Sequence, residues 1–206
     1  MTVEMYSLGH SNLTFDEFAN LLTKVGVSAV ADVRSSPVSK QFPWFSRDDL
    51  RSNLRHRGIS YSFLGEQLGG RPKNQSLFRN GIANYVAMAE TEAFRTGIER
   101  LLAGAEKYRI AMVCSERDPL HCHRCLLVGR HLLSLGINTR HIHSQRAVET
   151  QVEAEDRLLI EENLYSDDFL YPRDQRINEA YMRRNREVAY SLPSKGETTK
   201  TWAKNP

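Results

Sequence analysis

The stretch IAMVCSERDPLHCHRCLLVGRHLLSLG, residues 110–136, decides the fold class because it joins a buried strand to a helix. Its first four residues are all apolar, which is typical of a strand that is covered on both faces. From about Leu120 to Leu135 the leucines recur at the spacing of one helix face, and Gly136 ends the helix. A strand that leads directly into a helix is the repeating unit of α/β proteins.

The same alternation continues on both sides of this stretch. Before it, the apolar patterns predict strands at 5–8, 27–33 and 59–63, with helices at 15–25 and 47–57 between them. Two more helices are predicted near 82–89 and 93–107, and a fifth strand at 138–142 follows. We therefore predict an α/β, Rossmann-like fold, in which a mostly parallel sheet has helices on both faces.

The chain beyond this alternation predicts a helical C-terminal extension. Its patterns indicate a polar helix from 148 to about 164 and a second one at 175–190. We divide the chain into an α/β core domain at 1–146, a helical extension at 147–190 and a disordered tail at 191–206. The tail is polar and contains Pro and Gly, a composition that does not support a packed core.

Composition excludes several classes of protein. Of the 206 residues, 40% are hydrophobic and 26% are charged, which is ordinary for a globular protein, and the net charge of +3 permits an anionic partner. Since no apolar run approaches the ~20 residues of a membrane span and no secretory signal is readable, we expect no membrane association. The three cysteines are clustered between Cys114 and Cys125, which favours a reducing compartment and hence the cytoplasm.

Polar side chains follow three of the predicted strands at the point where each strand ends. His10 and Ser11 follow the first strand, Asp32 lies at the end of the second, and Cys114 and Glu116 follow the fourth. In parallel sheets the ligand crevice lies outside the carboxyl ends of the strands. We therefore expect these side chains to converge on one rim of the sheet.

The sequence around these residues carries a recognisable set of motifs. They are Gly9-His10-Ser11, Asp32-Val33-Arg34, Tyr61-x-x-Leu64-Gly65, Leu68-Gly69-Gly70-Arg71 and Cys114-x-Glu116-x-x-Pro119-x-x-Cys122-His123-Arg124. Together they resemble the domain-of-unknown-function 488 family over about residues 6–143, with one extra residue, Asp118 or a neighbour, before Pro119. The resemblance implies a Rossmann-like α/β domain but no activity, because none is established for the family.

The residue chemistry itself favours a cysteine-dependent enzyme, a transferase or hydrolase. Cys122 lies near the start of the predicted helix, where unpaired N–H groups stabilise a thiolate, and neighbouring basic residues lower a thiol pKa further. The catalytic candidates are Cys114, Cys122, Glu116, Asp32 and His10. The candidates for binding an anionic, nucleotide-like or nucleic-acid substrate are Ser11, Arg34, Arg71, His123 and Arg124. We expect no cofactor.

Two other functions stay open. A zinc site can draw on Cys114, Cys122, Cys125, His121 and His123. The spacing argues against it, because only one short ligand pair exists and neighbours on a helix, such as Cys122 and His123, point in different directions. No metal ligand is therefore assigned. The second alternative is a non-catalytic nucleic-acid-binding module, supported by the arginine-rich stretch at 181–186.

Several conspicuous residues have structural interpretations. Cys125 begins an apolar helix face and is expected in the core. The aromatic group Phe42, Trp44 and Phe45 is expected to pack under a loop. His141 and His143 are expected at the surface.

Overall fold

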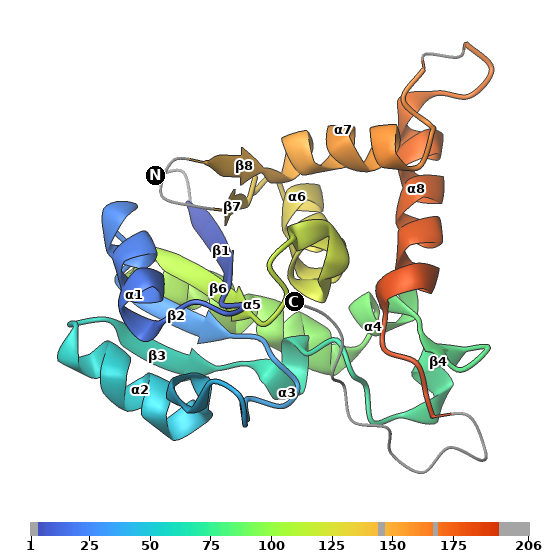
Figure 1. Cartoon of the computed structure of the whole chain (residues 1–206). Helices are drawn as coiled ribbons and strands as arrows, with labels where there is room; N and C mark the ends of the chain where they lie inside the picture. The colour runs from blue at the N-terminus through green and yellow to red at the C-terminus, as the bar shows by residue number, and fades with distance from the viewer. Residues whose placement is uncertain (1–3, 144–146, 167–168, 194–206) are drawn as a thin grey trace.

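A six-stranded sheet forms the centre of the molecule (Figure 1) in the computed structural model, which describes residues 4–143, 147–166 and 169–193. The strand order is β3-β2-β6-β1-β7-β8. The first five are parallel, and β8 runs antiparallel to β7. Their bounds are β1 Met5–Gly9, β2 Ala29–Asp32, β3 Ser60–Phe63, β6 Ile110–Cys114, β7 Arg140–Ile142 and β8 Val148–Thr150. The prediction of a mostly parallel sheet is confirmed.

Helices cover both faces of the sheet, as predicted. One face packs against α1 (Phe15–Lys24) and α2 (Arg47–His56). The other face is covered by α3 Gly65–Leu68, α4 Tyr85–Ala89, α5 Glu92–Ala105 and α6 Arg130–Ser134. The short elements are η1 Pro43–Phe45, η2 Gln75–Leu77, η3 Pro119–His121, η4 Arg124–Gly129 and the hairpin β4 Phe78–Arg79 with β5 Ile82–Ala83.

The strand β6 shows how alternation assigns side chains to the two faces. Ala111 and Val113 pack on the α1 and α2 side, whereas Ile110, Met112 and Cys114 face the α3-to-α6 side. All five residues are buried because β6 lies between β2 and β1. The pattern therefore places Cys114 at the carboxyl end of a central strand, on the more heavily covered face.

The C-terminal helices pack on the same face. Helix α7 (Gln151–Glu161) and α8 (Arg173–Val188) form the upper right part of the molecule in Figure 1. Ala154, Leu158, Ala180 and Tyr181 belong to the same hydrophobic cluster as the sheet residues of this face. No helix within the described residues is both long and apolar enough to cross a membrane.

Two predicted helices begin later than the sequence pattern indicated. Residues 82–89 start as β5, and α4 begins only after Asn84, whose side chain accepts hydrogen bonds from two backbone N–H groups of the helix. Residues 148–150 form β8, and α7 begins after Thr150, which makes a capping box with Glu153. In both cases the capping residue, rather than the apolar pattern, sets the boundary. Ser191 bridges to Ile82, and the predicted tail from 194 onward lies outside the described residues.

Candidate metal-binding site

The segment after β6 is not the continuous helix that the leucine pattern predicted. Asp118 accepts a hydrogen bond from the N–H of Leu120 at 2.9 Å and starts the short helix η3. Cys122 follows with extended backbone angles, φ −141° and ψ 139°, and His123 then leads into the π-helical turn η4. Because one of these two neighbours is extended and the other helical, their side chains point to the same place. The prediction that they point apart is wrong.

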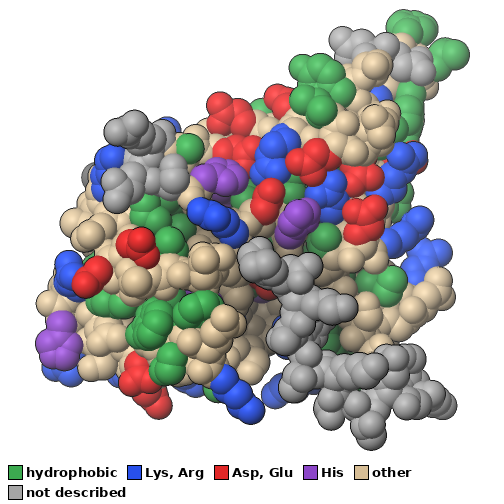
Figure 2. Space-filling view, in the orientation of Figure 1, with side chains coloured by type: hydrophobic (Ala, Val, Ile, Leu, Met, Phe, Trp, Pro, Cys, Tyr) green, Lys and Arg blue, Asp and Glu red, His purple; other side chains and the backbone are tan. Residues whose placement is uncertain are grey.

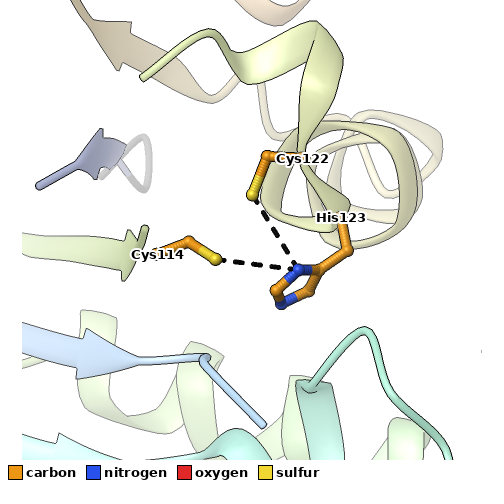
Figure 3. Close-up of side chains that lie close together, drawn as sticks. All are labelled: Cys114, Cys122 and His123. Carbon is orange, nitrogen blue, oxygen red and sulfur yellow. Dashed lines mark hydrogen bonds between the residues drawn. The ribbon is translucent and has the colours of Figure 1, made fainter. Parts of the chain in front are cut away.

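Three ligand-type atoms converge at the end of β6 (Figure 3). The Sγ atoms of Cys114 and Cys122 each lie 3.8 Å from Nδ1 of His123, and all three atoms lie within 4.8 Å of one another. The other ring nitrogen of His123, Nε2, donates to the carbonyl oxygen of Val33 at 2.9 Å. In the neutral ring this contact leaves the lone pair of Nδ1 facing the two sulfurs.

A carboxylate lies against the two sulfurs. Oε2 of Glu116 is 3.1 Å from the sulfur of Cys114 and 3.1 Å from the sulfur of Cys122. The two cysteines and His123 are buried, whereas Glu116 is exposed on the loop after β6. The cluster is therefore closed by the protein on one side and reaches the surface through Glu116.

Charge within the cluster shifts the pKa values of its members in opposite directions. Burial alone raises the pKa of Cys122, but the hydrogen bond from Cys114 and the charges of Arg124 and His123 outweigh burial and hold it well below its usual range. The pKa of Cys114 is raised by its hydrogen bond to Cys122 and by burial. Burial lowers the pKa of His123, but the Cys122 thiolate reverses this and raises it. One thiolate and one protonated thiol at neutral pH are the expected state.

Arg124 holds the loop that carries the carboxylate. Its guanidinium donates to the carbonyl oxygens of Glu116 at 2.6 Å and Arg117 at 2.8 Å, and to Oγ of Ser7 at 3.3 Å. The side chain is completely buried. Sequence reasoning placed Arg124 among the substrate-binding candidates, and the structure directs both of its terminal nitrogens at the protein's own backbone.

The second group of predicted residues forms a neighbouring cluster around a buried ion pair. Arg34 makes a two-pronged contact with Asp32, through Nε at 2.8 Å and Nη2 at 2.6 Å. Its remaining nitrogen donates to the carbonyl oxygen of Phe45 at 2.8 Å and lies 3.3 Å from Nε2 of His10. Tyr61 donates to Asp32 at 2.8 Å. Asp32, Arg34 and His10 are buried, so this cluster borders the cysteines as internal structure.

The remaining predicted residues lie at the edge of the site. Ser11 has a φ of 44°, an uncommon backbone conformation for a residue with a side chain, and its N–H donates to the carbonyl oxygen of Ser115. The guanidinium of Arg71 lies 5.2 Å from the ring centre of Tyr190. Sequence reasoning missed Tyr85, whose pKa is raised by burial and by the negative charge of Cys122 beside it. Its position after a capped turn carries no signal in the local pattern.

The structural interpretations of the other residues are largely confirmed. Cys125 is buried, and burial raises its pKa to about 12. Phe45 is fully buried and stacks on His10 with the ring centres 4.2 Å apart. The expected surface position of His141 is wrong: it is fully buried, with Ser7 2.6 Å from Nδ1 and Gln151 2.9 Å from Nε2.

Acid is expected to destabilise the fold through its buried histidines. Burial lowers the pKa of His141 to about 3, and burial with the charge of Arg34 lowers that of His10 to about 4. As pH falls below ~6.5, these histidines bind protons in the unfolded chain but not in the folded chain. Each histidine therefore lowers the free energy of unfolding by about 1.4 kcal/mol per pH unit. This loss continues until the folded-state pKa is reached. Urea unfolding at pH 7, 6 and 5 with a chelator present measures this loss of stability. The surface variant His56→Gln should show the same dependence of stability on pH. Equal stability at pH 7 and 5 would contradict the expectation.

Comparison with known proteins identifies a family. A family model described as domain of unknown function DUF488 matches residues 14–131, which is more than half of the 206-residue chain. No curated protein and no solved structure matches the chain. The matched range includes the cysteines and His123 and ends within α6, so α7 and α8 lie beyond it.

Proposed function

Since this chain belongs to the DUF488 family, whose description assigns no activity, the function must come from the site, and we propose a zinc-dependent enzyme with Cys114, Cys122 and His123 as metal ligands. The observation that carries this proposal is the convergence of two sulfurs and one ring nitrogen. Zinc prefers these donors in tetrahedral geometry. The carbonyl oxygen behind the ring of His123 is the kind of contact that orients a metal-bound histidine.

The spacing of the donor atoms suits the ion. Zn–S and Zn–N bonds of about 2.3 and 2.0 Å at a tetrahedral angle separate sulfur from nitrogen by about 3.5 Å. Both sulfur–nitrogen distances here are 3.8 Å, so each donor needs to move by only a few tenths of an ångström. A metal also removes the need to hold a proton between the two sulfurs, because both bind it as thiolates.

Glu116 supports a catalytic rather than a purely structural metal. Three protein ligands leave a fourth position for water, which is the arrangement of catalytic zinc sites. Glu116 contacts both sulfurs and is carried on an exposed loop, so we propose that its carboxylate lies beside a water in the fourth position and accepts a proton from it. The reaction class that follows from this proposal is hydrolysis, in which a group is transferred to water.

The substrate proposal remains an anionic, nucleotide-like molecule. Arg34 and Arg124 donate their hydrogen bonds to groups within the protein, so we propose that they position the site and do not contact the substrate. We propose direct contact with the substrate for Arg71 and Arg117, which are exposed. Because a site with two thiolates requires reduced cysteines, we keep the cytoplasm as the proposed compartment. The nucleic-acid module has less support, since Arg184 in its arginine-rich stretch is buried against Glu161 and Glu162.

A second candidate is the cysteine-dependent enzyme predicted from the sequence. It is favoured by the alignment of Cys122 Sγ, His123 Nδ1 and the Val33 carbonyl, which resembles a nucleophile, its base and the group that orients the base. The low pKa of Cys122 suits a nucleophile. It ranks second because the residue is only 2% exposed, which leaves a substrate little access to the sulfur.

Metal analysis separates the two candidates. The protein, expressed with zinc in the medium, should carry about one zinc ion per chain, and Cys114→Ser, Cys122→Ser and His123→Asn should each weaken zinc binding by at least ~100-fold, beyond the usual cost of changing a residue behind a ligand. Cys125→Ala is the matched control, since this buried cysteine lies outside the cluster and should leave the metal in place.

The opposite outcome is equally informative. A wild-type protein without zinc that also fails to take up zinc or cobalt in titration would overturn the metal proposal. Rapid alkylation of Cys122 near pH 6, lost only in Cys122→Ser, would then establish the nucleophile. With zinc bound, the same thiol should resist alkylation until a chelator is added.

A further inference from the structure

The loop that carries the metal ligands is clamped by residues that lie beyond the family match. Asp118 precedes the short helix η3 that leads into Cys122, and Arg157 of α7 grips its carboxylate with two hydrogen bonds, 2.9 Å from Nη2 and 3.1 Å from Nη1. The same guanidinium binds Glu149 through Nε and Nη2 and Glu161 through Nη1. All five N–H groups of Arg157 therefore have acceptors, which fixes its orientation.

The surface around this arginine is a mixed network of charges. Figure 2 shows acidic and basic side chains intermingled over α7. Arg157 is 29% exposed and Glu149 15%, so the network is partly shielded from solvent. Among the acidic partners of Arg157, Asp118 belongs to the metal-binding loop, whereas Glu149 and Glu161 belong to β8 and α7. The network thus ties the loop to the extension.

A second connection runs through the interior. Nε of Arg124 donates to Ser7, Ser7 donates to Nδ1 of His141, and Nε2 of His141 donates to Oε1 of Gln151, the first residue of α7. Ser7 and His141 each accept a hydrogen bond from the group before them in this series and donate one to the group after them. This fixes the tautomer of His141, with the proton on Nε2. At its other end, Arg124 holds the carbonyl oxygen of Glu116.

The first turn of α7 also packs into the helix that follows the ligands. The side-chain nitrogen of Gln151 lies 3.3 Å from the sulfur and 3.4 Å from the carbonyl oxygen of Cys125, and donates to Tyr181 of α8 at 2.9 Å. A Cβ on Gly129 would overlap Oε1 of Gln151. The glycine in the π-helical turn therefore makes room for the side-chain amide of Gln151. π-Helical turns often occur at functional sites.

We infer that α7 is a positioning element of the metal site, acting through Arg157 on Asp118 and through Gln151 on the Arg124 chain. The inference rests on the proposed zinc centre. It gives the segment after residue 131 a role in the chemistry of the matched domain. Neither residue touches the ligand atoms, so both act by holding the loop in the geometry that the metal requires.

Metal titration with a spectroscopic readout tests this inference. Arg157→Gln is expected to raise the Kd for Zn²⁺ by about 10- to 100-fold, the usual cost of losing a contact behind the ligands. In the Co²⁺-loaded protein it should also move the visible absorption bands, which report the geometry of the ligands and do not respond to stability alone. Arg157→Lys, which keeps one charge contact without the two-pronged grip, should recover part of the affinity.

Further variants identify the route. Asp118→Asn keeps the cap on η3 but loses the charge, so it should match Arg157→Gln, and the double variant should be no worse than either one. Gln151→Met should likewise shift the cobalt bands. The control is Arg173→Gln, which removes a 2.8 Å ion pair between α8 and Asp156 of α7 without touching the loop, and should change neither readout.

The outcomes distinguish the two proposals. If the wild-type protein binds no zinc or cobalt, the proposed function fails. If the wild-type protein binds metal, and folded Arg157→Gln matches it in affinity and in cobalt spectrum, the positioning inference fails while the metal site stands. Should Gln151→Met not fold, the Arg157 and Asp118 variants still decide the question.

Discussion

Asp32→Ala is expected to destabilise the protein by about 3–5 kcal/mol, because it leaves a buried guanidinium without its counter-charge. Arg34 is 4% exposed and Asp32 is fully buried, so water cannot replace the lost partner. The carboxylate also accepts from Tyr61 and from the backbone N–H of Arg34. This loss is a large share of the 5–15 kcal/mol by which domains are usually stable. Urea unfolding followed by circular dichroism measures it.

The matched control is Tyr61→Phe, which removes one hydrogen bond to the same carboxylate. Its cost should be about 1.5–3 kcal/mol, as for one hydrogen bond to a charged group. A loss below about 1 kcal/mol for Asp32→Ala would mean that Arg34 finds water or another anion. Arg34 would then be accessible at the rim of the sheet. That result would support the role in anion binding that the sequence predicted for it.

Gly9→Ala is expected to have the largest effect on the site. A Cβ on Gly9 would overlap the carbonyl oxygen of Glu116, which is backbone and cannot swing aside as a flexible side chain does. The same carbonyl is held by Arg124. Displacing it moves the loop that carries Glu116 and leads to Cys122. We therefore expect zinc binding to weaken more than in Arg157→Gln, with a fall in melting temperature that metal no longer reverses.

Gly104→Ala is the control for the substitution itself. Its added Cβ would lie 3.0 Å from the end of the Ile110 side chain, a flexible group, and alanine favours the helix α5 by up to about 1 kcal/mol over glycine. Stability and metal affinity should stay close to wild type. If Gly9→Ala also retains full zinc affinity, the close approach of β1 to the Glu116 loop is not needed for the site.

The parts of the fold that repeat a pattern were predictable. The strands β1, β2, β3, β6 and β7 and the helices α1, α2 and α5 follow from apolar spacing, and the cap at Thr14 was readable because Glu17 completes it. The patterns failed where a single side chain overrides them. Asn84 and Thr150 delay two helices, and neither delay shows in the hydrophobic spacing.

The geometry of the site could not be predicted from the sequence, and the roles assigned to its residues stay predictions. The carboxyl ends of β1, β2 and β6 lie at the same edge of the sheet because these strands are parallel neighbours. This brings His10, Asp32 and Cys114 into one region. The relative direction of Cys122 and His123 depended on one extended residue between η3 and η4, which a helix-based argument cannot supply. The engagement of Arg34 and Arg124 was likewise hidden, since their partners Phe45 and Arg117 present backbone carbonyls that have no sequence signature.

The strand order sets the sequence of events when the chain is made. The strands β1 and β2 follow each other in the sequence but do not pair with each other. Each pairs with β6, where Ile110 is the partner of both Met5 and Ala29. Such distant pairings make folding slow, because the long intervening loop must close first. On the ribosome, β1 and β2 stay without this shared partner until Ile110 and the rest of β6 have been synthesised. The loop that carries Glu116 and leads to Cys122 follows β6 directly, so it is synthesised just after the strand with which β1 and β2 both pair.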